Sequence, residues 1–504
     1  MYSYICNVLN KDIQEEKNII ISQKEYDDLV AENAYIKQQL ADLKRLIFGR
    51  KSEKISPIPG LPTLFDSDYQ EEVPVETKEI TYTKTIKKKK EKPVRKGLPS
   101  HLPRIEEIIE PEGITDAHKR IGEEITEILE YTPARMYVRR IIRPKYIDPQ
   151  TEIISIGLLP SMPIPKGIAG PTLLAHIMVS KFIDHLPLYR QLKIFKRIKV
   201  DISSSTIGGW FAKIGELITP LYKELEQCVL YNTDYLQVDE SPIKVQDRDK
   251  KGSLHQGYMW VVREPVSGLV LFKYNKGRSK SVPELLFKNF TGTLQTDGYK
   301  VYKSFKTKGE ITLLGCMAHA RRYFEKAKDN DYPRAKHALG LIQQLYLIER
   351  KAKEKAIDTE TKYRYRQLYA VPILNTLKKW LKDNQIKMMP KSSIAKAINY
   401  ALSIFDNLER YTEDGRYEID NNMIENSIRP LALGRKNYLF AGNHVAAQSY
   451  AMMYSFFATC KINNVNPQEW LSDVLDRIQD HNINKVDELL PHNWKRIKSH
   501  SPVL

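Results

Sequence analysis

The chain has few cysteines and no long hydrophobic run, and these shortages exclude several classes of protein. Only four of its 504 residues are cysteine, and Cys6, Cys228, Cys316 and Cys460 lie far apart in the sequence. This favours reduced thiols over a disulfide framework. No apolar stretch approaches the roughly 18 to 20 residues that span a bilayer, and the first residues show no signal-peptide pattern. We therefore expect a soluble cytoplasmic protein with no membrane partner.

Acidic residues are scarce relative to basic ones. The chain has 79 Lys and Arg against 62 Asp and Glu, which gives a formal net charge of +17. Clustered basic side chains gain free energy by displacing counterions from phosphates, so we expect DNA as the partner and association with the nucleoid when it is bound. A surface that is charged only for solubility would show the same balance.

The strongest concentration of basic charge lies between Lys84 and Arg104, where nine Lys and Arg stand against Glu91 alone. Its centre is a run of four lysines, Lys87, Lys88, Lys89 and Lys90. Such an arm predicts sequence-independent affinity for DNA that falls with added salt, although similar runs also occur in solvated tails.

Residues 22–48 repeat apolar side chains with heptad spacing. One seam position holds Tyr26, Asn33, Leu40 and Ile47, and the other holds Leu29, Ile36 and Leu43. This pattern predicts a coiled coil and a homodimer or higher oligomer, with the single Asn favouring a parallel dimer. The repeat is short, so an amphipathic helix docked on its own domain is the alternative.

Residues 166–230 have helical periodicity with clear breaks. The serines at 203–205 are good N-caps for a helix that follows them. Short turns between helices, together with the basic residues Lys193, Lys196 and Arg197, resemble a helix-turn-helix DNA reader. Generic helical packing would give much the same pattern.

From Thr233 the pattern changes to short β-like runs. Three runs that hairpins would link are followed by a helix-like KSVPELLFKNF and two more runs, GTLQTDGYKVY and ITLLGCMAHA. This order is the one that a ribonuclease-H-like core requires, and a right-handed crossover would set the fourth strand parallel to the first and beside it. The predicted fold class is therefore α/β, with a mixed sheet.

Two aspartates close β-like runs that this topology would make neighbours. Asp239 ends YLQVD and Asp297 ends GTLQTD. Cleavage or transfer at a phosphodiester needs an activated oxygen nucleophile and relief of charge on the leaving oxygen, which two Mg²⁺ or Mn²⁺ ions about 3.5 to 4 Å apart provide. Hard cations prefer carboxylate oxygens. Asp239 is predicted to bridge both ions and Asp297 to bind one; a surface carboxylate or a helix cap is the alternative for either residue.

A third acid, Glu425, lies on the helix-like run IDNNMIENSI. It is the candidate ligand of the second ion, although its position alone identifies it less firmly than the aspartates. Arg429 follows it one turn later, and Pro430 predicts that the helix kinks or ends there. Beyond the proline, Arg435 and Lys436 are candidate phosphate contacts.

The motif CMAHARRYF contributes three further candidates. His319, Arg321 and Arg322 are predicted to contact DNA or to brace the active site, and packing on neighbouring helices is the alternative.

These motifs together resemble the transposases of the insertion-sequence 66 family of bacterial mobile elements. The similarity rests on YLQVDESPIKV, GYMWV, LQTDGYKVY, CMAHARRYFEKA and EIDNNMIENSIRPLALGRKNYLFAG, with FGRKSEK after a zipper-like helix. The resemblance implies a DDE transposase with a ribonuclease-H-like core and an acidic triad of Asp239, Asp297 and Glu425. It also implies that accessory proteins of the element are possible partners.

One departure concerns zinc. The resemblance implies a cysteine-based zinc finger after the zipper, whereas no cysteine lies between Cys6 and Cys228. We therefore predict no zinc, and Mg²⁺ or Mn²⁺ as the cofactor.

The predicted domain order follows these features. The parts are a coiled-coil helix (1–50), a linker with the basic arm (51–99), a small basic β-rich module (100–165), a helical DNA-binding region (166–230), the first part of the core (231–324), a helical insertion (325–410), the second part of the core (411–445) and C-terminal helices (446–504).

The leading functional hypothesis is cleavage at the ends of a mobile element, followed by transfer of the 3′ hydroxyl into target DNA. The alternatives are a structure-specific nuclease that does not join strands and a catalytically decayed DNA-binding regulator.

Overall fold

The computed structural model describes residues 136–139, 145–147, 154–156, 161–247, 253–307 and 309–494. The chain divides into two units, and the smaller one contains strands β1 (Lys145–Ile147) and β2 (Ile154–Ile156), which pair antiparallel. The predicted coiled coil, the run Lys87 to Lys90 and most of the predicted basic module lie outside the described residues. The larger unit contains all of the elements discussed below.

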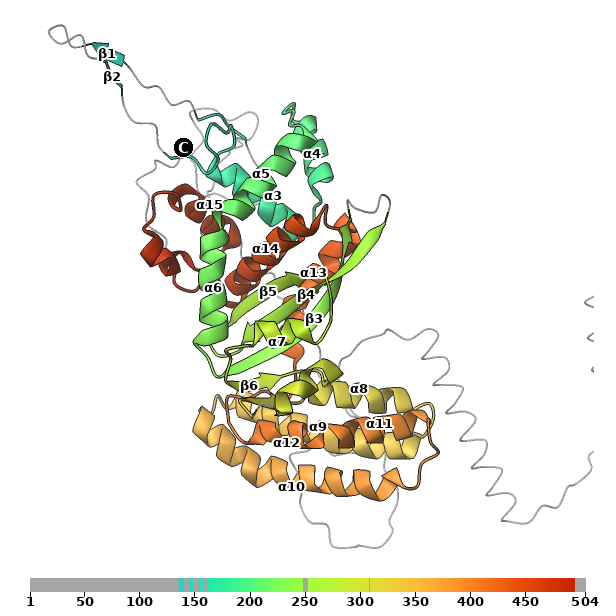
Figure 1. The fold of residues 1–504 in the computed structure, drawn as a ribbon. Helices are drawn as coiled ribbons and strands as arrows, with labels where there is room; N and C mark the ends of the chain where they lie inside the picture. Colours follow the sequence, from blue (N-terminus) through green and yellow to red (C-terminus); the bar gives the residue numbers. More distant parts are fainter. Residues whose placement is uncertain are drawn as a thin grey trace, which may run out of the picture. The chain divides into compact units, whose positions relative to one another are not determined.

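A five-stranded mixed sheet is the centre of the larger unit (Figure 1). Its strands are β3 (Tyr235–Gln246), β4 (Leu254–Glu264), β5 (Leu269–Asn275), β6 (Gly292–Gln295) and β7 (Ile311–Leu314). Their order in the sheet is β5-β4-β3-β6-β7. The first three strands pair antiparallel, whereas β6 is parallel to β3 and β7 is parallel to β6. The expectation that the fourth strand lies parallel to the first and beside it is confirmed.

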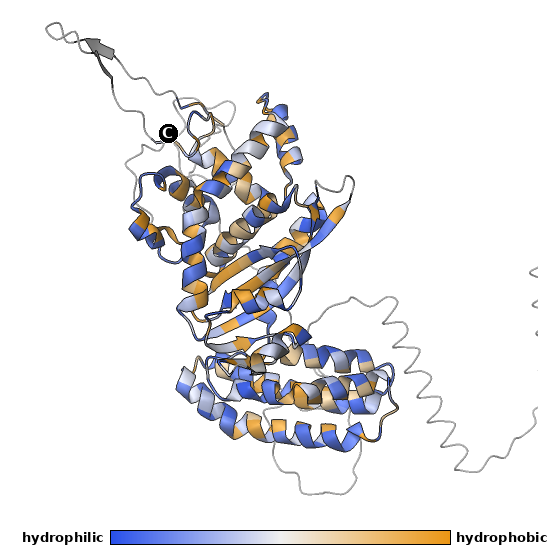
Figure 2. Ribbon diagram, in the orientation of Figure 1, coloured by the Kyte–Doolittle hydropathy of each residue, from blue (hydrophilic) through white to orange (hydrophobic). Residues whose placement is uncertain are grey.

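The connection between β5 and β6 contains the short helix α7 (Ser281–Leu286), and the 3-10 helix η1 (Lys300–Thr307) lies between β6 and β7. The first four residues of β3, the last six of β4 and the first four of β5 are buried, as expected of strands covered on both faces, whereas the second half of β3 alternates between buried and exposed residues. Figure 2 shows the hydropathy of these strands.

Gly292 sets the register between β3 and β6. Its φ of +134° lies in a region that residues with a Cβ rarely adopt, and a Cβ built there would collide with the backbone of Asp234. The amide of Thr293 donates to the Asp234 carbonyl oxygen at 2.7 Å. The missing side chain thus lets the start of β6 approach the start of β3, which aligns Gln237 with Gln295 further along.

Four helices precede the sheet: α3 (Pro171–Phe182), α4 (Leu188–Arg197), α5 (Ser204–Leu217) and α6 (Thr219–Tyr231). Their boundaries match the breaks expected from the sequence, and the Ser203 hydroxyl caps α5 by accepting from the Thr206 amide at 3.0 Å. Two more helices follow the sheet, α14 (His444–Ile462) and α15 (Pro467–Arg477).

Helix α14 covers the outer edge of the sheet along β5. Two hydroxyls of α14 meet amides that the edge strand would otherwise leave unpaired: Thr459 accepts from Val270 at 3.2 Å, and Ser455 accepts from Phe272 at 2.8 Å. All four residues are buried. This edge is therefore closed to pairing with another chain.

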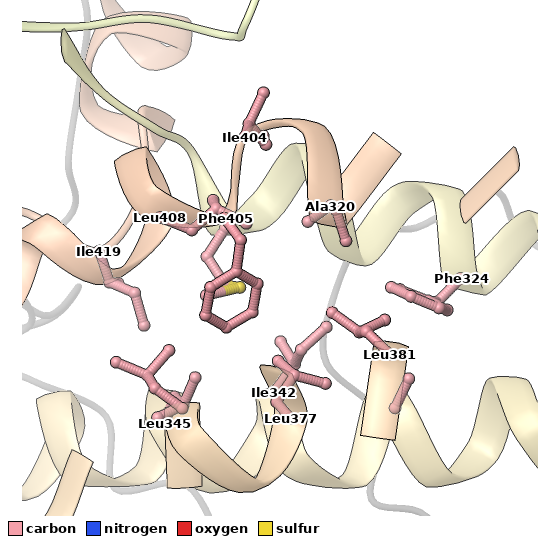
Figure 3. Packing of buried hydrophobic residues seen from close by; sticks show 14 of the residues in the cluster. Ala320, Phe324, Ile342, Leu345, Leu377, Leu381, Ile404, Phe405, Leu408 and Ile419 are labelled. Atoms are coloured by element: carbon pink, nitrogen blue, oxygen red, sulfur yellow. The ribbon is translucent and has the colours of Figure 1, made fainter. Parts of the chain in front are cut away.

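In the sequence, a group of helices, called the helical layer below, lies between β7 and the helix that carries Glu425. It consists of α8 (Met317–Ala327), α9 (Tyr332–Glu354), α10 (Thr359–Gln385), α11 (Ser393–Ser403), α12 (Phe405–Glu409) and the 3-10 turn η2 (Arg410–Thr412). Phe324, Ile342, Leu345, Leu381 and Phe405 pack together in its core (Figure 3).

Helix α13 (Asn422–Tyr438) follows this layer and contains Glu425 in its first turn. It does not end at Pro430 but continues to Tyr438, where Leu439 caps it with a φ of +66°. A proline removes one intrahelical hydrogen bond, and here the flanking turns remain helical. Among the described helices, none is long and apolar enough to cross a membrane.

Candidate active site

Asp239 lies within β3, and Asp297 follows two residues after the end of β6, the parallel neighbour of β3. Gln237 and Gln295 are register partners of these strands, and the Gln237 side-chain amide donates to the side-chain oxygen Oε1 of Gln295 at 2.9 Å. The two strands that precede the aspartates are therefore neighbours, as expected. The metal-binding role of the two aspartates stays a prediction.

The chain segment before α13 is fastened to the same strands by buried amides. The Gln295 side chain donates to the Glu418 carbonyl oxygen at 2.7 Å. The Asn421 side chain, which is fully buried, donates to the Val238 carbonyl oxygen at 3.1 Å. These bonds hold the first turn of α13, and with it Glu425, at the end of the sheet that carries the aspartates. The amide side chains of Gln237, Gln295 and Asn421 were not recognised as functional in the sequence.

The electrostatics of Asp239 report how close the other acids lie. The pKa of Asp239 is raised to about 7, mainly by burial and to a smaller extent by the negative charges of Glu240, Asp297 and Glu425. The Glu240 amide donates to its carboxylate at 2.8 Å and opposes the rise. Carboxylates from β3, from the end of β6 and from α13 are therefore near enough to repel one another.

Glu425 is held from the side by α8. The Arg322 guanidinium donates to both carboxylate oxygens, at 2.8 and 2.6 Å, and the His319 imidazole lies 4.0 Å from the nearer oxygen. Arg322 and His319 also contact one another at 3.1 Å. Of the two roles expected for these residues, the structure shows bracing of the acid; Arg321 instead pairs with Glu325 on its own helix.

Glu240 is a fourth carboxylate that sequence analysis missed. Its side chain is only 1% exposed, and it accepts hydrogen bonds from Arg278 and from the Tyr302 hydroxyl. Burial raises its pKa, while the bonds from Arg278 oppose the rise. The available signal was its place directly after Asp239, but an acid beside another acid on a strand normally faces the opposite side of the sheet.

The remaining candidates for DNA contact are distributed over two helices. Lys193, Lys196 and Arg197 are exposed on α4, and Arg429 and Lys436 are exposed on α13. They stay predictions, as does the helix-turn-helix interpretation of α4 and α5.

Arg435 differs from these because it is engaged within the protein. It donates to the Ser241 hydroxyl at 2.9 Å and to the Pro242 carbonyl oxygen at 2.6 Å, which ties the last turn of α13 to β3.

The donor set determines which metal ion would fit. Asp239 and Asp297 offer the hard oxygen ligands that Mg²⁺ and Mn²⁺ prefer, and a cation would relieve the repulsion that raises the Asp239 pKa. Glu425 would have to leave Arg322 to join them, and within the described part of the chain no three potential ligands are already gathered around one point. The residues fit such an ion by ligand type, with one side-chain movement still required.

Comparison with protein families covers almost the whole chain. The model of the "Transposase IS66 family" matches residues 166–449, which include all three acids, and the "IS66 C-terminal element" matches residues 455–492. The chain belongs to the IS66 family of transposases. Two further models of the family match the amino-terminal part, "Transposase C of IS166 homeodomain" at residues 36–106 and "zinc-finger binding domain of transposase IS66" at residues 111–147.

The zinc-finger match falls on a segment without cysteine. Residues 111–147 contain one histidine, His118, as their only classical zinc ligand other than carboxylates. The position of a zinc finger in the family is thus present in this IS66 transposase, whereas its usual ligands are not. That the chain binds no zinc stays a prediction.

Several relatives align over most of their length. An uncharacterized protein of Sinorhizobium fredii, y4jD, is 32% identical over 97% of both chains. Two others from the same strain, y4hP and y4qI, are 28% and 32% identical over 92% and 80% of this chain and over 90% and 77% of their own.

Proposed function

We propose that this IS66 transposase is a metal-dependent DDE enzyme with a ribonuclease-H-like core that cuts the ends of a mobile DNA element and joins them to target DNA. The observation that carries the proposal is the nearness of acids from three separate segments, Asp239 on β3, Asp297 after β6 and Glu425 on α13, since the charges of Asp297 and Glu425 both act on Asp239. Membership of the family implies a DNA-cutting enzyme, and the strand order of the sheet is the one that this core requires.

Asp239, Asp297 and Glu425 would hold divalent cations beside the middle of β3, just beyond the end of β6. When bound, Mg²⁺ or Mn²⁺ would lower the pKa of an attacking oxygen and offset the charge that develops on the phosphate and the leaving oxygen. The three carboxylates would hold the ions at fixed positions beside the reacting phosphate. Arg322 would then exchange Glu425 for a phosphate of the DNA backbone as the acceptor of its N–H groups.

The reaction consists of two displacements at phosphorus. In the first, water attacks a phosphodiester at the element end, the bond from phosphorus to the 3′ oxygen breaks, and a 3′ hydroxyl and a 5′ phosphate result. In the second, that 3′ hydroxyl attacks a target phosphodiester, a new bond from phosphorus to the 3′ oxygen forms, and the target's own bond to its 3′ oxygen breaks. Neither step requires a covalent bond to the protein.

A strand-joining assay tests this proposal. The full chain, the element's terminal DNA and Mg²⁺ should yield joined strands, and Glu425→Gln should reduce the yield at least about 1,000-fold, because a metal site contributes several kcal/mol and each 1.4 kcal/mol is tenfold in rate. Glu360→Gln, on α10 and paired with Arg364, is the matched control and should retain activity. Full activity in Glu425→Gln would refute the assignment.

The Arg322 pair favours a second candidate function, because Glu425 is already neutralised without a metal. In a chain that only binds terminal DNA, this pair would persist and nothing would be cut. Metal-independent binding of the terminal DNA by the wild-type chain, with no nicks under any metal, would support this alternative. Nicks without joined product would instead indicate a nuclease.

A further inference from the structure

The buried carboxylate Glu240 does not face solvent, and its oxygens are occupied by protein donors. Arg278, which follows β5, donates to it through Nε at 2.7 Å and through Nη2. The Tyr302 hydroxyl donates to its other oxygen at 3.1 Å. Both oxygens of Glu240 accept hydrogen bonds, and only 1% of its side chain is exposed. Glu240 therefore positions Arg278 and Tyr302 and is not an open ligand for an ion.

Arg278 is held in one orientation from two directions. Its guanidinium lies 3.9 Å from the centroid of the Tyr299 ring, a stacking distance, while Glu240 binds one edge of the fork. Yet 37% of the arginine side chain stays exposed, and its hydrogen bonds to Glu240 use only Nε and Nη2. The opposite edge of the guanidinium is therefore directed away from Glu240 with donors in a fixed plane.

This arginine belongs to the same neighbourhood as the aspartates. Tyr299, on which it stacks, donates its amide to the Asp297 carboxylate at 2.8 Å. The charges of Arg278 and Asp297 influence one another, as those of Asp297 and Asp239 do. Exposed lysines flank the position in sequence, Lys276 and Lys280 around Arg278 and Lys300 after Tyr299. A basic rim thus borders the acidic end of the sheet.

A DNA strand whose phosphodiester lies at Asp239 and Asp297 carries its next phosphates past this rim. A planar guanidinium with a free edge matches two phosphate oxygens, which a lysine does not. We propose that Arg278 binds a DNA phosphate next to the one that is cut, and that Glu240 and Tyr299 are positioning residues that hold it there. The proposal deepens the proposed function, since it concerns the same site.

The test measures DNA binding and not cutting, so that its result does not depend on the chemistry. A fluorescein-labelled DNA duplex of arbitrary sequence is titrated with the full chain in Ca²⁺ buffer over a series of salt concentrations. Arg278→Ala should weaken binding about tenfold, as expected for one charge-assisted contact, and should reduce the slope of log affinity against log salt by about 1. Arg364→Ala, which removes an exposed arginine paired with Glu360 on α10, is the matched control and should change neither.

The positioning role is tested by coupling. If Glu240 acts through Arg278, then Glu240→Gln should weaken binding, and the double variant should bind no worse than Arg278→Ala alone. If the Glu240–Arg278 pair had only a structural role, the DNA affinity per folded molecule would be unchanged in Glu240→Gln, in Arg278→Ala and in the double variant. If the other variants fold poorly, Tyr299→Leu provides a second test, because it keeps the Glu240–Arg278 pair and removes only the ring on which Arg278 stacks. It should lose part of the DNA affinity.

Equal affinity and equal salt slope in Arg278→Ala and Arg364→Ala would overturn the inference. Absence of cutting by the wild-type chain, with the binding differences intact, would overturn the proposed function and leave this inference standing.

Discussion

Two clusters of charged side chains in this protein differ in whether their charges are balanced by protein groups. In the helical layer, Arg366 is fully buried and closes all of its bonds inside the protein. Glu349 accepts from it at 2.8 and 2.6 Å, and the carbonyl oxygens of Tyr411, Asp414 and Tyr417 accept at 2.7 to 2.8 Å. The positive charge and every directed donor are matched by a protein group.

Beside the middle of β3 and the end of β6 the charges do not balance. Four carboxylates lie in this neighbourhood against two guanidinium groups, namely Asp239, Glu240, Asp297 and Glu425 against Arg278 and Arg322. Burial and then the neighbouring negative charges raise the pKa of Asp239, and only the Glu240 amide opposes the rise. A cluster that closes on itself stabilises the fold, whereas one that keeps an excess of charge is suited to a ligand of the opposite sign.

The largest expected effect is the loss of the closed cluster. Arg366→Met should lower the free energy of unfolding by about 3 to 5 kcal/mol, because Glu349 then keeps only the longer contact with Lys362, at 3.5 Å, and three carbonyl oxygens lose their donor. Urea unfolding followed by circular dichroism measures the change. Arg364→Met, two residues earlier and exposed, is the control and should change stability by less than about 0.5 kcal/mol. A loss of stability in Arg366→Met no larger than in the control would show that the Arg366 cluster does not stabilise the fold.

Lys181 is a buried cation with no acidic partner among the described residues, so it can be set beside the two clusters. Lys181 is 4% exposed, lies 4.6 to 5.5 Å from the rings of Phe182, Tyr438 and Tyr450, and burial lowers its pKa to about 8. The unfolded chain keeps this proton up to about pH 10.5, so it binds more protons than the folded chain between pH 8 and 10.5, and the folded chain gains stability there as pH rises.

Lys181→Met should therefore stabilise the protein by up to about 3 kcal/mol at pH 7, at 1.4 kcal/mol per pKa unit. The advantage should shrink to nothing by about pH 10.5. Taking the difference between the two proteins removes the titration of the tyrosines. The exposed Lys213→Met is the control. A difference that does not vary with pH would show that Lys181 is already neutral or otherwise paired.

The smallest expected effect is the response of the open cluster to a cation. Mg²⁺, Mn²⁺ or Ca²⁺ at ten times its dissociation constant should raise the free energy of unfolding by about 1.4 kcal/mol at pH 8, since the ion binds only the folded chain. Asp239→Asn should remove this response. Thermal unfolding with and without the ion measures it. Equal stabilisation of the wild type and of Asp239→Asn would place the ion elsewhere.

The sequence was sufficient for the parts of the site that depend on local pattern and strand order. Asp239 and Asp297 end apolar runs, and their meeting follows from one parallel pairing. Glu425 was reached through family resemblance, because the distance along the chain from Asp297 spans several helices whose packing no local pattern encodes. Arg278 and Glu240 were missed for the same reason: their pairing joins a loop after β5 to the middle of β3.

Functional amide side chains were also missed, because the sequence does not show which group a glutamine in a strand will bind by hydrogen bonding. Gln295 and Asn421 read as ordinary strand and helix-start residues, and their function appears only once the Glu418 and Val238 carbonyl oxygens are beside them. The persistence of α13 beyond Pro430 is a further case in which packing against the sheet, through Arg435, outweighs a local breaker.

The bond between Arg322 and Glu425 joins residues 103 positions apart, and helices α9 to α12 lie between them in the sequence. Closing so long a segment costs conformational entropy before any contact repays it, so the contact of Glu425 with its partners is expected to form late in folding. During synthesis the ribosome releases both aspartates well before the glutamate. A nascent or truncated chain would therefore hold the two aspartates without the third acid of the proposed site.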